Sequence, residues 1–300
     1  MLGGCGGGAT RFSGAGPSDA GGGGELRYAL ADDPGDFDPL HATTISAQLV
    51  DRQLFEPLVE RLQGPYGSVS GRRGLAVGWR PSGDYRVWSF ALRTGVRFQD
   101  DTPLNAEAVV ANAERWRSDP AGQRLLPGLV AADAPSPNLV RLILAGPDRG
   151  LPAKLANPRL GIVSPPALTE SGEGALLARA ERAGSGPFEL QHSGDGRAIL
   201  TRYRGWWGSG HGLGPELDTV AFSVLPGAGD RVDALRSGAV RVAGDLPPGP
   251  ARALQRDPLL TSVGAGSGHA VAFERSVRGI EGWRPEPLSG VWVALVARTG

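Results

Sequence analysis

The sequence predicts a layered α/β fold, and three observations support that prediction. The chain has 300 residues, of which 40% are hydrophobic, and this is enough to bury a sizeable core. Patterns typical of strands and of helices alternate along the chain, as they do in proteins that pack helices against a sheet. The 47 glycines and 25 prolines indicate frequent turns between short elements.

The charge balance narrows the classes of function. Lys plus Arg and Asp plus Glu each total 31, so the formal net charge is zero. We therefore expect no nucleic-acid partner, because proteins that bind nucleic acid usually carry an excess or a patch of basic residues. The sequence has no apolar run of about 18 residues that would predict a membrane span. We expect contact with a membrane only through an attached lipid.

The first residues, 1–24, are predicted to be a lipoprotein-type N-terminus and a flexible tether. In MLGGCGGG, Leu2 and two glycines precede Cys5, which is similar to the lipobox at which bacteria join a lipid to a cysteine. The Gly-rich residues 6–24 bury too little surface to fold. The basic and apolar regions of a signal peptide do not precede Cys5, so we expect the signal peptide to be incomplete at this start. A free thiol on a Gly-rich tail is the alternative.

The folded part is predicted to begin with a strand and a capped helix. Residues 26–30, LRYAL, indicate a strand, and the acidic turn with two prolines that follows would end it. Apolar residues then recur near helical spacing from Ile45 to Leu62, with Thr44 as the N-cap. Pro57 is expected to kink or end this helix, because proline lacks a backbone N–H.

The middle of the chain predicts a half-buried strand and a second capped helix. Trp88, Phe90 and Leu92 alternate with smaller residues, so their side chains would share one face of a strand. Asn105 can cap the helix that follows. Residues 138–145, NLVRLILA, predict another strand after a proline-rich turn.

The second half of the chain continues the alternation of strands and helices. Strands are predicted at 186–190, 197–203, 217–225 and 239–244, and helices at 229–238 and 248–257. Trp206 and Trp207 follow the second of these strands. If they extend it, their side chains point to opposite faces and one of the two rings is exposed.

No sequence motif predicts catalysis, a bound metal or a cofactor. The four histidines are far apart and lack the spacing of a metal site. The sequence has neither a serine-nucleophile motif nor a phosphate-binding glycine loop, so we predict that the protein is not an enzyme and uses no cofactor. The four aspartates within residues 32–38 could bind a cation, but their spacing and the nearby prolines favour a solvated turn.

Seven blocks of sequence occur in the order typical of one family. They are DPGDFDPL, RQLFEPLVE, residues 75–110, GSGPFEL, LTRYRGWWG, residues 217–240 and LPPGPARALQRDP. On these blocks the chain resembles the family 5 extracellular solute-binding proteins, the peptide, dipeptide and nickel receptors of bacterial ABC importers. Within the blocks, Asp101 stands in place of a turn glycine of the family, and Ala108 in place of an acidic residue.

The resemblance implies an α/β fold of the type II periplasmic-binding-protein class. Its first lobe has a mixed sheet and carries an inserted, smaller α+β subdomain. Residues 25–55 and 166–300 would form the first lobe, and residues 56–165 the subdomain. In the family, a strand similar to residues 268–274 leads into a second lobe. A segment similar to the C-terminus of the family follows here instead, so the resemblance predicts that the opposing lobe is missing.

The resemblance implies a function as the extracytoplasmic solute-binding component of an ABC importer, anchored to the cell membrane by a lipid on Cys5. Its partners would be a peptide or another small solute and the importer permease. The suggested ligand-binding residues are Thr43, Thr44, Ile45, Ser185, Gly186 and His269, although each could equally be an ordinary turn or strand-end residue. Half a cleft leaves a solute partly hydrated, so binding would be weak. The alternative is an accessory or degenerate lipoprotein that docks a partner chain through the uncovered face.

Overall fold

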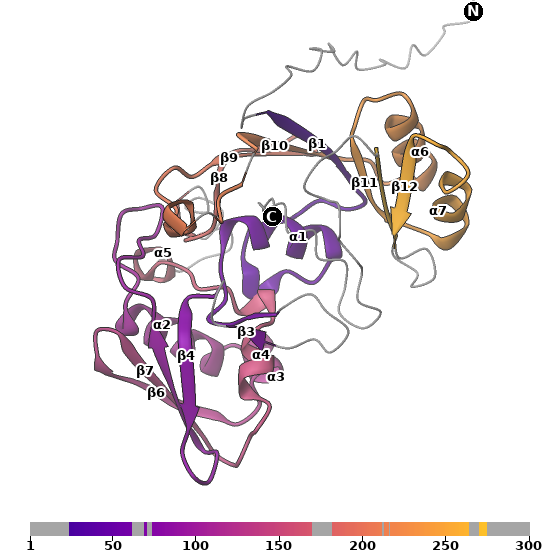
Figure 1. Ribbon diagram of the computed structural model, residues 1–300. Helices are drawn as coiled ribbons and strands as arrows, with labels where there is room; N and C mark the ends of the chain where they lie inside the picture. Colours follow the sequence, from indigo (N-terminus) through magenta and orange to yellow (C-terminus); the bar gives the residue numbers. More distant parts are fainter. Residues whose placement is uncertain are drawn as a thin grey trace, which may run out of the picture.

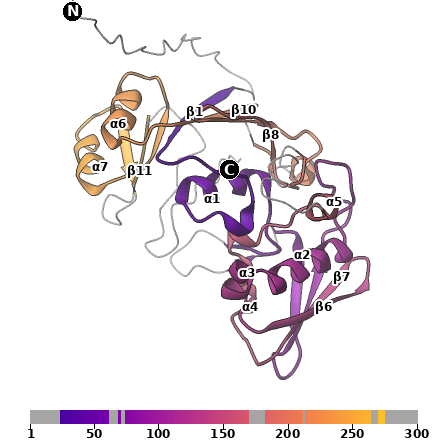
Figure 2. The same cartoon turned by 180° about the vertical axis from the view of Figure 1, so that it is seen from behind.

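A computed structural model describes residues 24–61, 69–70, 74–169, 182–211, 213–215, 217–263 and 270–274. The strands in these residues form a seven-stranded sheet, a four-stranded sheet and a two-stranded sheet. Figures 1 and 2 show the seven-stranded sheet arching over α1, with the four-stranded sheet and its helices at the other end of the molecule. Cys5 and His269 lie outside the described residues.

The seven-stranded sheet is mixed, as predicted. In spatial order its strands are β12 (Leu260–Val263), β13 (Ala270–Glu274), β11 (Val242–Leu246), β1 (Glu25–Leu30), β10 (Thr219–Val224), β9 (Arg197–Arg202) and β8 (Phe188–Gly194). The central strand β1 pairs in parallel with β10 and with β11, and the remaining neighbours pair antiparallel. The sequence predicted the positions of β1, β8, β9, β10 and β11 along the chain.

Helices cover both faces of this sheet. They are α1 (Ile45–Leu54), α6 (Ala228–Arg236) and α7 (Pro248–Leu254). Side chains alternate along β1, so Tyr28 and Leu30 pack in one core cluster with Leu49 of α1. Ala29 belongs instead to the cluster that contains Leu235 of α6. The helix after β1 and the helix after β10 therefore lie on opposite faces of the sheet.

Helix α1 begins at its predicted cap but ends at Leu54, before Pro57 and well short of Leu62, the last residue of the helical spacing. The Oγ1 of Thr44 accepts a hydrogen bond from the backbone N–H of Ala47 at 3.1 Å, which satisfies one of the donors left free at a helix start. The helix ends at Leu54, and Phe55 is extended with φ −120°. A proline disfavours helical geometry in the residue before it. The chain therefore leaves the helix before Pro57.

The second sheet lies within residues 76–144. Its strands, in spatial order, are β4 (Ala76–Pro81), β5 (Val87–Leu92), β7 (Leu139–Leu144) and β6 (Leu129–Ser136). The helices in this part of the chain are α2 (Ala106–Ser118), α3 (Pro120–Leu125), α4 (Leu151–Leu155) and α5 (Pro165–Leu168). The two-stranded sheet pairs β2 (Glu60–Arg61) with β3 (Val69–Ser70). The predicted boundaries of the subdomain, 56–165, stay a prediction.

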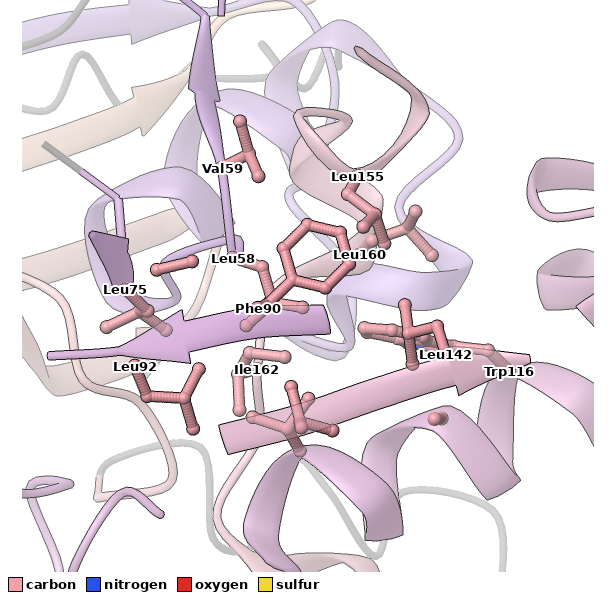
Figure 3. Packing of buried hydrophobic residues seen from close by; sticks show 14 of the residues in the cluster. Leu58, Val59, Leu75, Phe90, Leu92, Trp116, Leu142, Leu155, Leu160 and Ile162 are labelled. Carbon is pink, nitrogen blue, oxygen red and sulfur yellow. The ribbon is translucent and has the colours of Figure 1, made fainter. Parts of the chain in front are cut away.

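The core of this second part follows the predicted alternation. Trp88, Phe90 and Leu92 of β5 are all buried, and Figure 3 shows the ring of Phe90 directed toward Leu155 and Leu160. Strand β6 was not predicted, because its sequence LVAADAPS lacks a clear alternation of apolar and polar residues. Antiparallel pairing with β7 holds these residues in a strand.

The turn before α2 accommodates Asp101 at the position where a glycine was expected. Asp101 has φ +66°, in the left-handed region that favours glycine. Aspartate tolerates this region better than most residues, and the N–H of Asp101 donates to the carbonyl of Phe98 at 3.0 Å. Helix α2 then starts at its predicted cap, since Asn105 Oδ1 accepts the N–H of Ala108 at 2.9 Å. The aspartate therefore replaces the expected glycine without loss of the turn.

Candidate ligand-binding site

The carboxyl ends of β1 and β10 are the place where this sheet can best bind a ligand. The two strands are parallel neighbours, and the helices that follow them lie on opposite faces. In open α/β sheets, ligands bind in the crevice outside the carboxyl ends of such a pair of strands. The segment that leaves β1 at this edge leads to Thr43, Thr44 and Ile45.

These three residues form the exposed start of α1. Thr43 is exposed, and Thr44 and Ile45 are half-buried. The Thr44 hydroxyl already caps the helix, whereas the side chain of Thr43 faces solvent. The backbone N–H of Asp32 donates to the Oγ of Ser46 at 3.2 Å, which holds the first turn of α1 against the end of β1.

A buried arginine fixes the loops at the same edge of the sheet. Arg231 of α6 is 3% exposed, and its Nη1 donates to the carbonyls of Leu225 and Pro226 at 2.6 and 2.8 Å. Its Nη2 donates to the carbonyl of Asp245 at 2.9 Å. Burial lowers the pKa of Arg231, and the Asp245 carboxylate opposes that shift. The ends of β10 and β11 are therefore held by one guanidinium, and we assign Arg231 a scaffold role.

A polar cluster joins the loop after β1 to the helices of the second sheet. His41 lies with its Nδ1 2.7 Å from Asp38 Oδ2 and its Nε2 3.0 Å from Asp119 Oδ2. Arg115 of α2 forms an ion pair with Asp38. Burial acts to raise the pKa of Asp119, but the N–H of Ala121 and the nearby His41 outweigh it, so this pKa is lowered. The cluster fixes the position of the loop that leads to Thr43.

Ser185 and Gly186 lie inside the protein. The Oγ of Ser185, a fully buried residue, donates to Glu56 Oε2 at 3.0 Å. The N–H of Gly186 donates to the carbonyl of Leu54 at 2.8 Å, and a Cβ at Gly186 would lie 2.4 Å from the carbonyl oxygen of Gln53. In this structure both residues hold the end of α1 against β8. A direct contact between them and a ligand stays a prediction.

Glu56 organises this buried region, and no pattern in the sequence singled it out. It is 7% exposed, and it accepts hydrogen bonds from Ser185 and from the Nε1–H groups of Trp206 at 3.3 Å and Trp207 at 3.0 Å. Burial raises the pKa of Glu56 to about 7, although these hydrogen bonds and the charge of Arg93 oppose the shift. A carboxylate within the apolar run LFEPLV was the available signal, because such a buried group must find donors.

The expectation that Trp206 and Trp207 point to opposite faces of a strand is wrong. They lie in a tight turn that continues into a 3-10 helix, Trp207–His211. Their ring centroids are 5.4 Å apart, and both indole N–H groups donate to Glu56. Trp206 is buried and Trp207 is half-buried, so neither ring is exposed. The turn replaces the strand because Trp206 N–H bonds to the carbonyl of Tyr203, three residues earlier.

The acidic turn after β1 is held by hydrogen bonds between its aspartate side chains and its backbone N–H groups. Asp33 Oδ1 accepts the N–H of Gly35 at 2.8 Å, and Asp38 Oδ1 accepts the N–H of Leu40 at 3.1 Å. These are the turn-forming contacts typical of aspartate. Within the described ranges no group of three or more His, Cys, Asp or Glu side chains could hold a metal ion, and no helix is long and apolar enough to cross a membrane.

Comparisons with known proteins agree with this architecture. Residues 72–278 match the family described as bacterial extracellular solute-binding proteins, family 5 Middle. The probable D,D-dipeptide-binding periplasmic protein DdpA of Escherichia coli (strain K12) is 27% identical over 236 residues, which are 77% of this chain and 45% of DdpA. The glutathione-binding protein GsiB of the same strain is 27% identical over 216 residues, which are 70% of this chain and 40% of GsiB.

A solved structure of another protein is also similar to this chain. The PBP AgaA in complex with agropinic acid, from A. tumefacien R10, is similar with a TM-score of 0.68 and 26% identity. The similarity covers 80% of this chain and 48% of AgaA. The chain thus spans a little under half the length of each of these three relatives, between 40 and 48%.

Proposed function

The chain belongs to the bacterial extracellular solute-binding proteins, family 5, and on this premise we propose that it is the extracytoplasmic solute-binding component of an ABC importer. We propose a peptide or a peptide-like compound as its solute. The names of DdpA, a probable D,D-dipeptide-binding protein, and of GsiB, a glutathione-binding protein, support this class of ligand. The importer permease would be the second partner.

The observation that carries the proposal is the exposed start of α1 at the carboxyl ends of β1 and β10. Thr43 is an exposed residue at this edge, directly before the Thr44 cap. An extended peptide can pair its backbone with exposed backbone groups at such an edge. We propose that Thr43, Thr44 and Ile45 contact the solute there, with Ser185, Gly186 and His269 as further members of the wall. The buried positions of Ser185 and Gly186 favour support of the wall through its backbone over side-chain contact.

Thermal unfolding of the 300-residue chain tests this function. Di- to pentapeptides, glutathione and nickel chelates would be added in turn, after a cooperative transition has been established. A ligand at about 100 times its dissociation constant adds roughly 2.7 kcal/mol to the unfolding free energy, which is a readily measured shift. Binding by a single wall is expected to be weak, so millimolar ligand is needed. A cooperative transition that no solute moves would contradict the proposal and favour a role in docking a partner chain.

A matched pair of variants tests the proposed position of the solute. Thr43→Trp fills the exposed edge beside α1, so it should abolish the thermal shift. Val77→Trp changes a residue that is 52% exposed on β4, in the other sheet, and should leave the shift intact. Equal effects of the two variants would contradict the proposed position.

We also propose that a lipid on Cys5 tethers the protein to the membrane. The support is the lipobox-like sequence and the Gly-rich residues after it. Cys5 is the single cysteine of the chain. Metabolic labelling with a radioactive fatty acid therefore tests attachment at one thiol. Label that persists in a Cys5→Ala variant, or a wild-type chain without label in its host, would contradict this proposal.

A further inference from the structure

A half-open recess lies at the other end of α1 from Thr43. Six of the residues that line it are Arg52, Glu56, Glu60, Pro187, Trp206 and Trp207, and its volume is about 590 Å³ including the solvent at its mouth. Helix α1 has ten residues, so about 15 Å of helix separates this recess from Thr43 at the start of the helix. Ser185, proposed above as part of the wall, reaches the recess through its hydrogen bond to Glu56. The inference below concerns a different ligand and does not require a solute at Thr43.

Among the described residues that line the recess, the charged side chains carry an excess of negative charge. Arg52 and Glu60 form an ion pair with each other, and both side chains are largely buried. Among the lining residues that the structure describes, Glu56 is the remaining charged group, and the hydrogen bonds it accepts from described residues come from neutral donors, the Ser185 hydroxyl and two indole N–H groups. Neutral donors stabilise a carboxylate without removing its charge. Once the Glu56 carboxyl is ionised, above its pKa of about 7, the recess offers a buried negative charge to a ligand.

The remaining walls are aromatic and apolar. The tryptophan rings and Pro187 form a surface against which a small apolar group can pack. Trp207 already binds a cation, because the guanidinium carbon of Arg93 lies 3.9 Å from the centroid of its ring. A carboxylate beside aromatic faces is the combination that attracts organic cations.

We propose that this recess binds a small organic cation, an alkylammonium or guanidinium ion, with its charge beside Glu56 and its apolar part against Trp206 and Pro187. An anion would meet the Glu56 and Glu60 carboxylates. A neutral molecule of the same shape would gain the apolar contact alone. Binding should therefore discriminate by charge at constant size.

The experiment uses the full chain and three probes of matched shape. Butylammonium, butanol and valerate are each titrated while the indole N–H signals of the seven tryptophans are followed by ¹⁵N NMR. Trp206→Phe and Trp207→Phe assign the two signals of the recess. Butylammonium is expected to shift these two signals saturably, with an affinity about tenfold higher than butanol, and valerate should cause no saturable shift. Equal shifts from the three probes, or no saturable shift with butylammonium, would overturn the proposal.

Variants identify the charge that attracts the cation. Glu56→Gln should lower the butylammonium affinity about tenfold and leave the butanol shift unchanged. Glu60→Gln, which removes the other, less buried carboxylate of the recess, should also weaken the binding of the cation. Glu107→Gln, on the exposed first turn of α2, is the control and should change nothing. Undiminished affinity in both recess variants would overturn the proposal.

The pH dependence of the unmodified chain provides a test that needs no variant of Glu56. Among the described residues, the charged or titratable groups around Glu56 are Glu60, Arg52, Arg93 and His211, whose ring lies 5.9 Å from that of Trp207. Protonation of the Glu56 carboxyl at low pH removes the attracting charge. Butylammonium should therefore bind about tenfold more tightly at about pH 8.5 than at about pH 5.5, and His211→Gln should keep this dependence. A pH-independent affinity, or a dependence lost with His211, would count against Glu56.

Discussion

The indole Nε1–H of Trp207 lies 3.0 Å from each of the two carboxylate oxygens of Glu56. Trp207 lies in the turn after β9, and Glu56 follows the end of α1, so one side chain holds two distant segments together. The face of the Trp207 ring packs against Arg93, directly after β5 of the second sheet. The two sheets therefore meet through a buried carboxylate and the indole that binds it.

The first prediction concerns the pH dependence of stability. The pKa of Glu56 is raised from 4.5 to about 7, so between these values the folded state holds a proton that the unfolded state has lost. The unfolding free energy should therefore fall by about 3 kcal/mol at most as the pH rises from about 4.5 to about 7, and should not fall further from this group above pH 7.

Comparison with Glu56→Gln isolates this effect. Urea unfolding of both proteins across the pH range should show that the fall is smaller in the variant by the contribution of Glu56. Burial also raises the pKa of Asp51, but that residue is present in both proteins and cancels from the difference. Parallel stability curves for the two proteins would show that the Glu56 carboxyl does not titrate in this way.

The second prediction ranks the two tryptophans. Trp207→Phe removes a donor that is 3.0 Å from both oxygens of Glu56, and Trp206→Phe removes one that is 3.3 Å from a single oxygen. Each substitution should cost about 1.5–3 kcal/mol of unfolding free energy, and Trp207→Phe should cost more. Trp79→Phe, at a half-buried position in β4, is the control with the same change of ring. Equal losses at all three positions would indicate ring packing instead of hydrogen bonding to Glu56.

The third prediction uses two glycines with opposite expected effects. A Cβ at Gly186 would lie 2.4 Å from the carbonyl oxygen of Gln53, so Gly186→Ala should destabilise the protein by about 3 kcal/mol. Gly229 lies in α6, and a Cβ there would meet nothing within 4 Å. Gly229→Ala should therefore stabilise by about 0.5 kcal/mol, because alanine loses less backbone entropy in a helix. Chemical denaturation measures both, and a tolerated Gly186→Ala would contradict the close approach of β8 to α1.

The fourth prediction separates two neighbouring threonines. Thr44→Ala removes the hydroxyl that accepts the N–H of Ala47, so it should cost about 1 kcal/mol of unfolding free energy. Thr43→Ala changes an exposed side chain and should alter stability by less than about 0.5 kcal/mol. Urea unfolding of both variants gives the comparison. Equal costs would mean that Thr44 does not act as the cap.

Local features of the fold could be predicted because their causes lie close together in the sequence. Thr44 and Asn105 cap helices by bonding to N–H groups three residues later, and Pro57 acts on the turn immediately before it. The alternation of Trp88 and Phe90 with smaller residues likewise depends on the geometry of a single strand. Strand β6, in contrast, has no such pattern and is formed by its pairing with β7.

By itself the sequence determined the α/β class, the starts of α1 and α2 and the buried face of β5. Only the tertiary structure decided that β1 lies between β10 and β11, and that Glu56 meets Ser185 and Trp207. These partners are 129 and 151 residues from Glu56 along the chain. Helix caps and the alternation along a strand arise from contacts over a few residues, so they can be recognised from residue types at short, fixed spacings. A buried carboxylate instead binds whichever donors the packed sheets bring to it, and no spacing in the sequence records that choice.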